Sequence, residues 1–299
     1  MRPSGERLVK FIVNPVSGNG RARRILPHLV TLAKKLGVDF DLQLTKAPEH
    51  ATELASDHPA DFDVVVAVGG DGTVNEVAAG IAETQTAMGI IPTGTGNDFV
   101  RAIGRLRDLQ AYVHRIISGK VKAVDVGILT LEKKDLLFVN GIGVGFDAEV
   151  ARESMNVHRL KGISRYLYAI VKTLYKYKST QMRVEVDNDV IDERTFLAAI
   201  GNGISAGGGF LLTPDAVIDD GLLDLCLVSD VSVGRVLQVL PSVLSGKHAK
   251  HPEVIMRKAK TIRIESEDSV SIHRDGEVPE KKVNSLAMRV EPGKLKIVV

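Results

Sequence analysis

The sequence contains one cysteine, no tryptophan and no long apolar run. A single cysteine cannot form an intramolecular disulfide, and the position of Cys226 within LLDLCLV predicts a small apolar side chain buried in a strand. No window approaches the ~18 to 20 uninterrupted apolar residues that a bilayer-spanning helix needs. The N-terminus shows no signal-peptide pattern. These absences predict a cytoplasmic protein, and any membrane contact would be peripheral.

The sequence also lacks a strong charge bias, repeats and low-complexity segments. Lysine and arginine number 39 against 37 aspartate and glutamate, and the formal net charge of +2 gives no support for a nucleic-acid partner. Hydrophobic residues make up 44% and charged residues 25%, which is typical of a soluble globular protein. The length of 299 residues favours two domains, and without a linker-like segment we expect them to share a tight cleft.

The most informative stretch is VVVAVGGDGTVNEV, residues 64–77. Its five leading apolar residues predict a strand covered on both faces, and the glycines end that strand. Apolar residues then recur at helical spacing, so a helix N-terminus with free backbone N–H groups follows the turn. An ordinary strand-to-helix connection also uses glycine and a capping Asp or Thr. Three glycines in four positions around Asp71 favour a phosphate site instead.

The distribution of strands and helices changes along the chain. Strands alternating with helices up to residue 124 predict an α/β domain with a doubly wound, mostly parallel sheet, whose ligands bind at the carboxyl ends of its strands. From 125 to 290 short strands dominate and predict a β-rich antiparallel sandwich or flattened barrel. Within it only 163–176 and 233–244 are predicted as substantial helices. The segment 291–299 either returns to the first domain or stays with the second.

Two loops, GGDGTVNE (69–76) and PTGTGND (92–98), together resemble the diacylglycerol kinase catalytic family. NPVSGNGRA (14–22) resembles its first loop, and GNGISAGGG (201–209), PDAVIDDGLLD (214–224) and HRDGE (273–277) resemble its second-domain signatures. NAD kinases share GGDGT, but the second-domain signatures favour the lipid kinase branch. The resemblance implies an α/β nucleotide-binding domain, a lipid-binding β-rich domain, and ATP- and Mg²⁺-dependent phosphorylation of a lipid hydroxyl, most simply that of diacylglycerol.

The resemblance also implies which residues contact the nucleotide. Backbone N–H groups of the first glycine-rich loop would cradle the phosphates, and Asp71 would hold or orient Mg²⁺. The full set of expected nucleotide contacts is Asn14, Thr45, Gly70, Asp71, Gly72, Thr73, Val74, Asn75, Glu76 and Thr95. Taken alone, Thr45 and Asp71 are equally consistent with helix capping, and an Asn-Pro turn at Asn14 needs no ligand.

Asp275 matches the catalytic aspartate of the family. As a general base it would accept the proton of the lipid hydroxyl, with Glu277 supporting the base or a metal. Without the resemblance, the Asp-Gly pair at 275 and 276 predicts a hairpin turn.

A second, structural Mg²⁺ is implied at the turn around Gly221. The resemblance assigns it the carboxylate of Asp220 and the backbone carbonyls of Val217 and Leu222, with a link through water to Asp125. From their local sequence, both aspartates are equally consistent with ordinary turn and strand-edge residues.

Two further segments have open interpretations. RYLYAIVKTLYKYK (165–178) is consistent with an interfacial helix at a membrane or with a helix that packs its apolar face on the second domain. NGIGVGFD (140–147) lacks the spacing of a dinucleotide fingerprint, so we interpret it as close backbone packing or as part of the lipid cleft.

The expected partner is therefore a lipid at the membrane surface, and a homodimer is left open. A soluble dinucleotide kinase and a nucleotide-binding regulator without turnover are the two alternatives.

Overall fold

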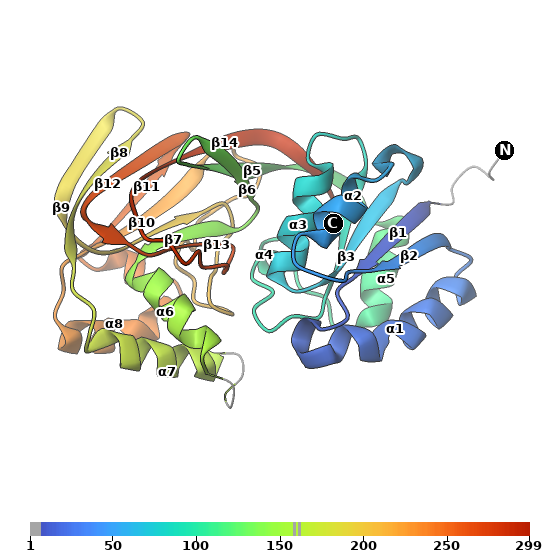
Figure 1. Cartoon of the computed structure of the whole chain (residues 1–299), viewed down its shortest axis with the longest axis horizontal. Coiled ribbons are helices and arrows are strands. Elements are labelled where there is room, and N and C mark those ends of the chain that lie inside the picture. The colour runs from blue at the N-terminus through green and yellow to red at the C-terminus, as the bar shows by residue number, and fades with distance from the viewer. Residues whose placement is uncertain (1–6, 158–159, 161–162) are drawn as a thin grey trace. The chain divides into compact units, whose positions relative to one another are not determined.

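The computed structural model describes residues 7–157, 160 and 163–299. The chain forms two compact units (Figure 1). The first extends to Val124 and includes Gly293–Val299, and the second comprises Asp125–Pro292.

The first unit is an α/β structure around a parallel sheet. β1 pairs with β2 on one side and with β3 on the other, β3 pairs with β4, and Ile297 near the C-terminus pairs with Met88 of β4. Every residue of β3 is buried, as its unbroken apolar run predicts. The strands are β1 (Leu8–Val13), β2 (Asp39–Leu44), β3 (Val64–Gly69) and β4 (Ala87–Pro92).

Helices follow the strands of this unit in turn. They are α1 (Ser17–Lys35), α2 (His50–Ser56), the 3₁₀ turn η1 (Pro59–Asp61), α3 (Asp71–Ile81), α4 (Phe99–Ala102) and α5 (Leu109–Ser118). α2 packs on α3, and α1 packs on α5. Gly80 allows the first of these contacts, since a Cβ there would lie 2.6 Å from the Cβ of Ala55. The alternation of parallel strands and helices confirms the fold class predicted for this half.

The second unit is built from antiparallel strands, as predicted. Its main strand order is β11-β10-β9-β8-β12-β14, while β7 pairs with β9 and β13, and β5 pairs with β6 and β14. The strands are β5 (Val121–Leu131), β6 (Lys134–Phe138), β7 (Gly141–Gly145), β8 (Thr180–Val186), β9 (Asp189–Gly201), β10 (Leu223–Ser229), β11 (Val254–Ala259), β12 (Thr261–Val270), β13 (Ile272–Arg274) and β14 (Val283–Val298). Their inward residues form an apolar core that includes Phe138, Met182 and Leu225.

Helices of the second unit cover a separate apolar cluster. They are α6 (Phe146–Met155), α7 (Ile163–Leu174), α8 (Val233–Val243) and the 3₁₀ turn η2 (Lys247–Lys250). α6 is a correction to the sequence analysis, which expected only two substantial helices. Its signal is weak because it begins directly after a glycine-rich strand and its buried residues include two alanines. Phe146 stacks on Phe196 with ring centroids 4.3 Å apart and anchors the cluster.

Two further expectations for this unit are confirmed. Cys226 is fully buried in β10, and burial raises the pKa of its thiol to about 12. α7 packs Ala169, Ile170 and Leu174 against the unit, so the packing interpretation of its apolar residues holds for one face of the helix. Among the described residues, no helix combines the length and the hydropathy required to cross a membrane.

Candidate functional site

The first glycine-rich loop joins β3 to α3. Gly70 is the N-cap residue, and Asp71 is the first residue of the helix, so the alternative in which Asp71 is the N-cap is wrong. Gly69 is required sterically because a Cβ there would lie 2.3 Å from the side chain of Thr73. Asn14, at the end of β1, donates from Nδ2 to the Thr73 Oγ1 at 3.1 Å. The loop therefore contacts the end of the neighbouring strand.

Asp71 joins this loop to the second glycine-rich loop. Its Oδ2 accepts the backbone N–H of Asn97 and its Oδ1 that of Asp98, each at 2.7 Å. A Cβ on Gly94 would lie 2.5 Å from the Cα of Gly70, so the two backbones approach closely. The structure thus gathers the loops that follow β1, β3 and β4 at one edge of the sheet, where backbone amides and a helix N-terminus favour an anion.

The remaining expected nucleotide residues lie in different surroundings. Val74 and Asn75 are buried in the first turn of α3, whereas Thr95 is exposed in the second loop. Thr45 follows β2 and does not cap α2, whose N-cap residue is Glu49. Glu76 accepts the backbone N–H of Ala51 at 3.0 Å and so ties α3 to α2. In this structure the Glu76 carboxylate therefore connects two helices, and its hydrogen-bond partner is α2 and not the backbone of the glycine-rich loop.

In the second unit, Asp275 lies in a nest of backbone amides. Its carboxylate accepts the N–H groups of Val139 at 2.9 Å, Asn140 at 3.0 Å and Gly141 at 2.7 Å. Burial raises the pKa of Asp275, and these three hydrogen bonds oppose that rise. The residue has a φ of +48°, a strained value held by the surrounding contacts.

The predicted turn around Asp275 is also present. The backbones of Arg274 and Glu277 exchange two hydrogen bonds of 2.8 Å, so Asp275 and Gly276 form its tip. Glu277 is exposed, and its carboxylate lies 3.2 Å from the guanidinium of Arg274. The turn and a buried carboxylate therefore coexist in one segment.

A histidine–aspartate pair lies beside this segment and was missed by the sequence analysis. Nε2 of His273 lies 2.8 Å from Oδ2 of Asp147, and both side chains are mostly buried. A Cβ on Gly143 would lie 2.2 Å from that Nε2, which confirms the interpretation of GIGVG as close backbone packing. The only signal in the sequence was the alternation of glycines in β7 next to a strand carrying a charged motif.

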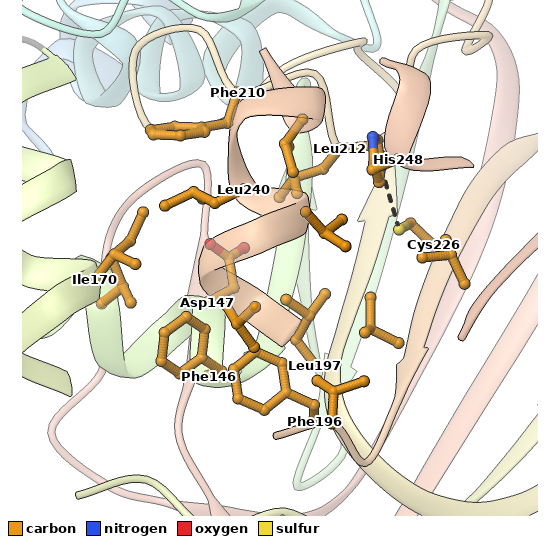
Figure 2. Close-up of a pocket in the computed structure, with 18 of the residues that line it drawn as sticks. Phe146, Asp147, Ile170, Phe196, Leu197, Phe210, Leu212, Cys226, Leu240 and His248 are labelled. Atoms are coloured by element: carbon orange, nitrogen blue, oxygen red, sulfur yellow. Dashed lines mark hydrogen bonds between the residues drawn. The ribbon is translucent and has the colours of Figure 1, made fainter. Parts of the chain in front are cut away.

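Asp147 of this pair lines an apolar cavity of about 110 Å³ between α6, α7, α8 and the sheet. Figure 2 shows the Asp147 carboxylate among aromatic and aliphatic side chains. A smaller cavity with a more polar lining adjoins it, shares Asp147 with it, and is also lined by His273 and Asn140. The main lining residues of the apolar cavity include Phe146, Ile170, Phe196, Leu197, Phe210, Leu212 and Leu240.

Cys226 and His248 close one side of the apolar cavity (Figure 2). Their Sγ and Nε2 atoms are 3.7 Å apart, and the same Nε2 lies 3.2 Å from the Leu212 carbonyl oxygen. Burial lowers the pKa of His248, so the imidazole stays neutral at neutral pH. The cavity is lined mainly by apolar side chains, and the acidic and basic residues in its wall are Asp147, Arg235, His248 and Glu253. This polarity suits an amphipathic molecule.

The predicted structural metal site lies in the turn before β10. Leu222 donates its N–H to Asp220 Oδ1 at 3.1 Å, and Gly221 donates to Asp125 Oδ2 at 2.7 Å. Mg²⁺ prefers hard oxygen donors. This turn offers one carboxylate and the backbone carbonyls of Val217 and Leu222, so its donor atoms are of the type that Mg²⁺ binds.

A lysine ammonium already contacts this turn. Nζ of Lys258 lies 2.9 Å from Asp220 Oδ2, 3.0 Å from Asp224 Oδ2 and 3.1 Å from the Asp215 carbonyl oxygen. No group of three or more His, Cys, Asp or Glu side chains within residues 7–157, 160 and 163–299 is arranged to hold a metal. Any cation at Asp220 would therefore share that carboxylate with Lys258.

Comparison with known proteins identifies the family. Residues 8–129 match the diacylglycerol kinase catalytic domain, and residues 140–299 match the YegS C-terminal NAD kinase beta sandwich-like domain. Curated proteins named diacylglycerol kinase from Staphylococcus saprophyticus and Staphylococcus haemolyticus are 32% and 34% identical, over 90% and 91% of this chain and 88% and 82% of theirs.

A crystal structure of a diacylglycerol kinase from Bacillus anthracis has the same fold, with a TM-score of 0.75 at 23% identity over 99% of this chain and 98% of that one. The chain belongs to the diacylglycerol kinase catalytic domain family and is a lipid kinase that uses ATP.

Proposed function

We propose that this protein transfers the γ-phosphate of ATP to the free hydroxyl of diacylglycerol and so produces phosphatidic acid. The observation that carries the proposal is the position of Asp275. This buried carboxylate lies two residues from His273, whose partner Asp147 lines an apolar cavity. A lipid kinase needs an acyl-binding cavity and a base for a hydroxyl within reach of one another. Membership of the family and the names of the relatives support the same substrate.

In this proposal the gathered loops of the first unit bind the triphosphate. Backbone amides at the start of α3 bind phosphate oxygens, and Asp71 keeps the first loop in register with Asn97 and Asp98 of the second. Gly70, Gly72 and Gly94 leave room for the phosphates to approach the backbone. Mg²⁺ bound beside Asp71 would neutralise charge on the β- and γ-phosphates.

The second unit holds the lipid. Acyl chains enter the apolar cavity, and the glycerol portion lies near Asp147 and the smaller cavity lined by His273 and Asn140. Asp275 accepts the proton of the hydroxyl as the phosphorus–oxygen bond forms and the bond from the γ-phosphorus to ADP breaks. To do so, its carboxylate exchanges one amide contact for the hydroxyl, because three backbone N–H groups already bind it.

A structural Mg²⁺ at the turn around Gly221 forms part of the proposal. Asp220 and the carbonyls of Val217 and Leu222 would hold it, and Asp125 would support the turn through its contact with Gly221. A second contact joins Asp125 to the same segment, because its backbone N–H donates to the Ile218 carbonyl at 2.7 Å.

The test is to incubate the purified protein with γ-labelled ATP, Mg²⁺ and a total lipid extract, and to identify the labelled product. We expect the label in phosphatidic acid. Asp275→Asn should bind ATP normally and label nothing, whereas the matched control Glu280→Gln, at an exposed position five residues further along the chain, should retain most turnover. Label on a dinucleotide, or ATP binding without lipid-stimulated consumption, would overturn the proposal.

A further inference from the structure

We propose that His273 is a positioning residue for the phosphoryl transfer. Its ring is held by Asp147 and in turn holds the backbone turn that carries Asp275, so that it sets the direction of the general base. The proposal rests on the function proposed above, in which Asp275 accepts the proton of the lipid hydroxyl. It gives a task to a histidine–aspartate pair that the proton transfer itself does not use.

The turn at Asp275 and Gly276 has an unusual backbone at both of its central residues. Their φ values are +48° and +86°, as in a two-residue hairpin turn with left-handed conformations at both positions. Glycine adopts such a value freely, whereas aspartate does so at an energetic cost. The N–H of Asp275 donates to the Gly141 carbonyl at 2.8 Å and so holds the first of the two residues. A side chain holds the second.

His273 provides this contact to Gly276. Its Nδ1 accepts the Gly276 N–H at 3.4 Å, a long hydrogen bond that can shorten when substrate is bound. Because a backbone N–H can only donate, this Nδ1 carries no proton, and the proton of the neutral ring lies on Nε2. Nε2 then donates to Oδ2 of Asp147 at 2.8 Å. One tautomer therefore satisfies both contacts.

Asp147 fixes the ring from the other side. It is the second residue of α6, where the helix dipole favours a carboxylate. The side chain of His273 is 7% exposed and that of Asp147 is 19% exposed. A Cβ on Gly143 would lie 2.2 Å from the His273 Nε2 and 2.3 Å from the Asp147 Oδ2, so only glycine leaves room for the pair. A ring bound at both nitrogens and packed in this way has one orientation, and it links the position of the turn to that of α6.

The contacts of the ring favour a positioning role over a direct role as the base. Both ring nitrogens are engaged, so the neutral imidazole has no lone pair left for a hydroxyl proton. The pair can instead change the orientation of the Asp275 carboxylate. A displacement of a reacting group by about 1 Å lowers a rate about a hundredfold. The position of the turn therefore matters for the rate of phosphoryl transfer.

Two variants of His273 separate its two contacts. Glutamine places an N–H₂ group where Nε2 lies and keeps the bond to Asp147, but it offers Gly276 no acceptor. We expect His273→Gln to lower kcat for diacylglycerol about tenfold to a hundredfold, with little change in KM. Asparagine places an oxygen where Nδ1 lies and keeps the contact to Gly276. His273→Asn should therefore retain a kcat at least about threefold higher than that of His273→Gln.

The stabilities of the two variants should have the opposite order. His273→Asn leaves the Asp147 carboxylate without its donor, and hydrogen bonds to a charged group contribute more than neutral ones. Urea unfolding should therefore show His273→Asn to be the less stable variant, although it is the more active one. A merely structural histidine would give the same order for stability and for kcat. The crossed order thus distinguishes positioning from folding.

The tautomer is measured independently of turnover. In the full chain labelled with ¹⁵N-histidine, NMR at neutral pH should show a ring with a protonated Nε2 and an unprotonated Nδ1 that is absent from the spectrum of His273→Asn. His114 provides the matched controls, because it lies at an exposed position of α5 in the first unit. His114→Gln and His114→Asn should leave kcat and KM unchanged.

Several outcomes would overturn the positioning role. They are an unchanged kcat in His273→Gln, a lower kcat in His273→Asn than in His273→Gln, a rise in KM alone, or a proton on Nδ1 of this ring. Failure of the proposed function has a different signature. Undiminished turnover by Asp275→Asn, or no labelled lipid from the unmodified chain, would remove the base that His273 positions. An inactive Asp275→Asn beside a fully active His273→Gln would overturn the positioning role alone.

Discussion

The carboxylate of Asp71 accepts the backbone N–H of Asn97 at 2.7 Å and thereby holds two glycine-rich loops together. The loops are 26 residues apart in the chain and follow neighbouring strands of the first unit. Asn97 has a φ of +50°, a left-handed value that Asn adopts more readily than most residues. The contact explains why an aspartate lies between glycines. The glycines leave space beside the backbone, and the Asp71 carboxylate fixes the position of the second loop relative to the first.

Asp71→Asn should destabilise the protein and weaken ATP binding. An amide can accept one of the two N–H groups through its oxygen but presents its own N–H₂ to the other, so a cost of about 1–3 kcal/mol is expected. Urea unfolding and calorimetric titration with ATP measure the two effects. Asp63→Asn is the control, because Asp63 also accepts a backbone N–H, that of Leu8 at 2.7 Å. Unchanged ATP affinity in Asp71→Asn would separate this contact from the phosphate site.

The acid limb of the pH profile of kcat/KM should have its midpoint above pH ~3.9, which is the ordinary pKa of aspartate. Burial raises the pKa of Asp275, and only the ionised carboxylate can accept a proton. Steady-state kinetics from pH 4 to 8 provide the measurement. A limb that falls below the ordinary value would mean that the three amide hydrogen bonds dominate over burial.

The same pKa has a consequence for stability, with a defined sign. Below pH ~3.9 Asp275 is protonated in both states, and above that pH the unfolded chain ionises first. The free energy of unfolding of the natural chain relative to Asp275→Asn should therefore fall as pH rises from about 4 through the raised pKa. Chemical unfolding at several pH values checks this, and a rise over the same window contradicts it.

His248 should make the second unit sensitive to mild acid. Burial lowers the pKa of His248 below the ordinary value of about 6.5, so in mild acid the unfolded chain binds a proton that the folded chain does not. The free energy of unfolding should fall as pH drops from about 6.5 toward 5. His248→Gln keeps a hydrogen-bond donor for the Leu212 carbonyl and should lose less stability over this range. Equal pH dependence in both proteins would exclude His248 as the cause.

Filling the apolar cavity should impair long lipids selectively. Leu240 lines the cavity from α8, and Leu240→Trp would place an indole ring where an acyl chain is proposed to lie. We expect KM for long-chain diacylglycerol to rise about tenfold, roughly the effect of losing one well-packed apolar contact. Short-chain diacylglycerol should be less affected. Leu237→Trp, on the exposed face of the same helix, should change neither value.

Mg²⁺ without nucleotide should raise the Tm of the protein through Asp220. Asp220→Asn should abolish this rise, because it removes the carboxylate that is proposed to bind this Mg²⁺ directly. Lys258→Gln should enlarge the rise, since the ammonium of Lys258 contacts the same carboxylate at 2.9 Å. Asp189→Asn, at an exposed position of β9, is the control. An equal Mg²⁺ effect in Asp220→Asn would exclude this turn as the metal site.

The sequence by itself determined the local elements of the site. The apolar run of β3 and the glycines after it define a strand, a turn and a helix N-terminus from neighbouring residues alone. The Asp275–Gly276 turn and the burial of Cys226 were likewise evident from short stretches. These features depend on backbone sterics and on local hydrophobic pattern, which act over a few positions of the chain.

Only the tertiary structure decided which of these residues meet. His273 and Asp147 are 126 residues apart, and Asp275 takes its amide contacts from residues 134 to 136 positions away. Nor could pattern alone show that Glu76 binds the backbone of α2, that Lys258 contacts Asp220, or that α6 follows β7. Such pairings depend on strand register and on close packing between distant segments, because hydrogen bonds and apolar contacts form only where the folded backbone brings the groups within a few ångströms.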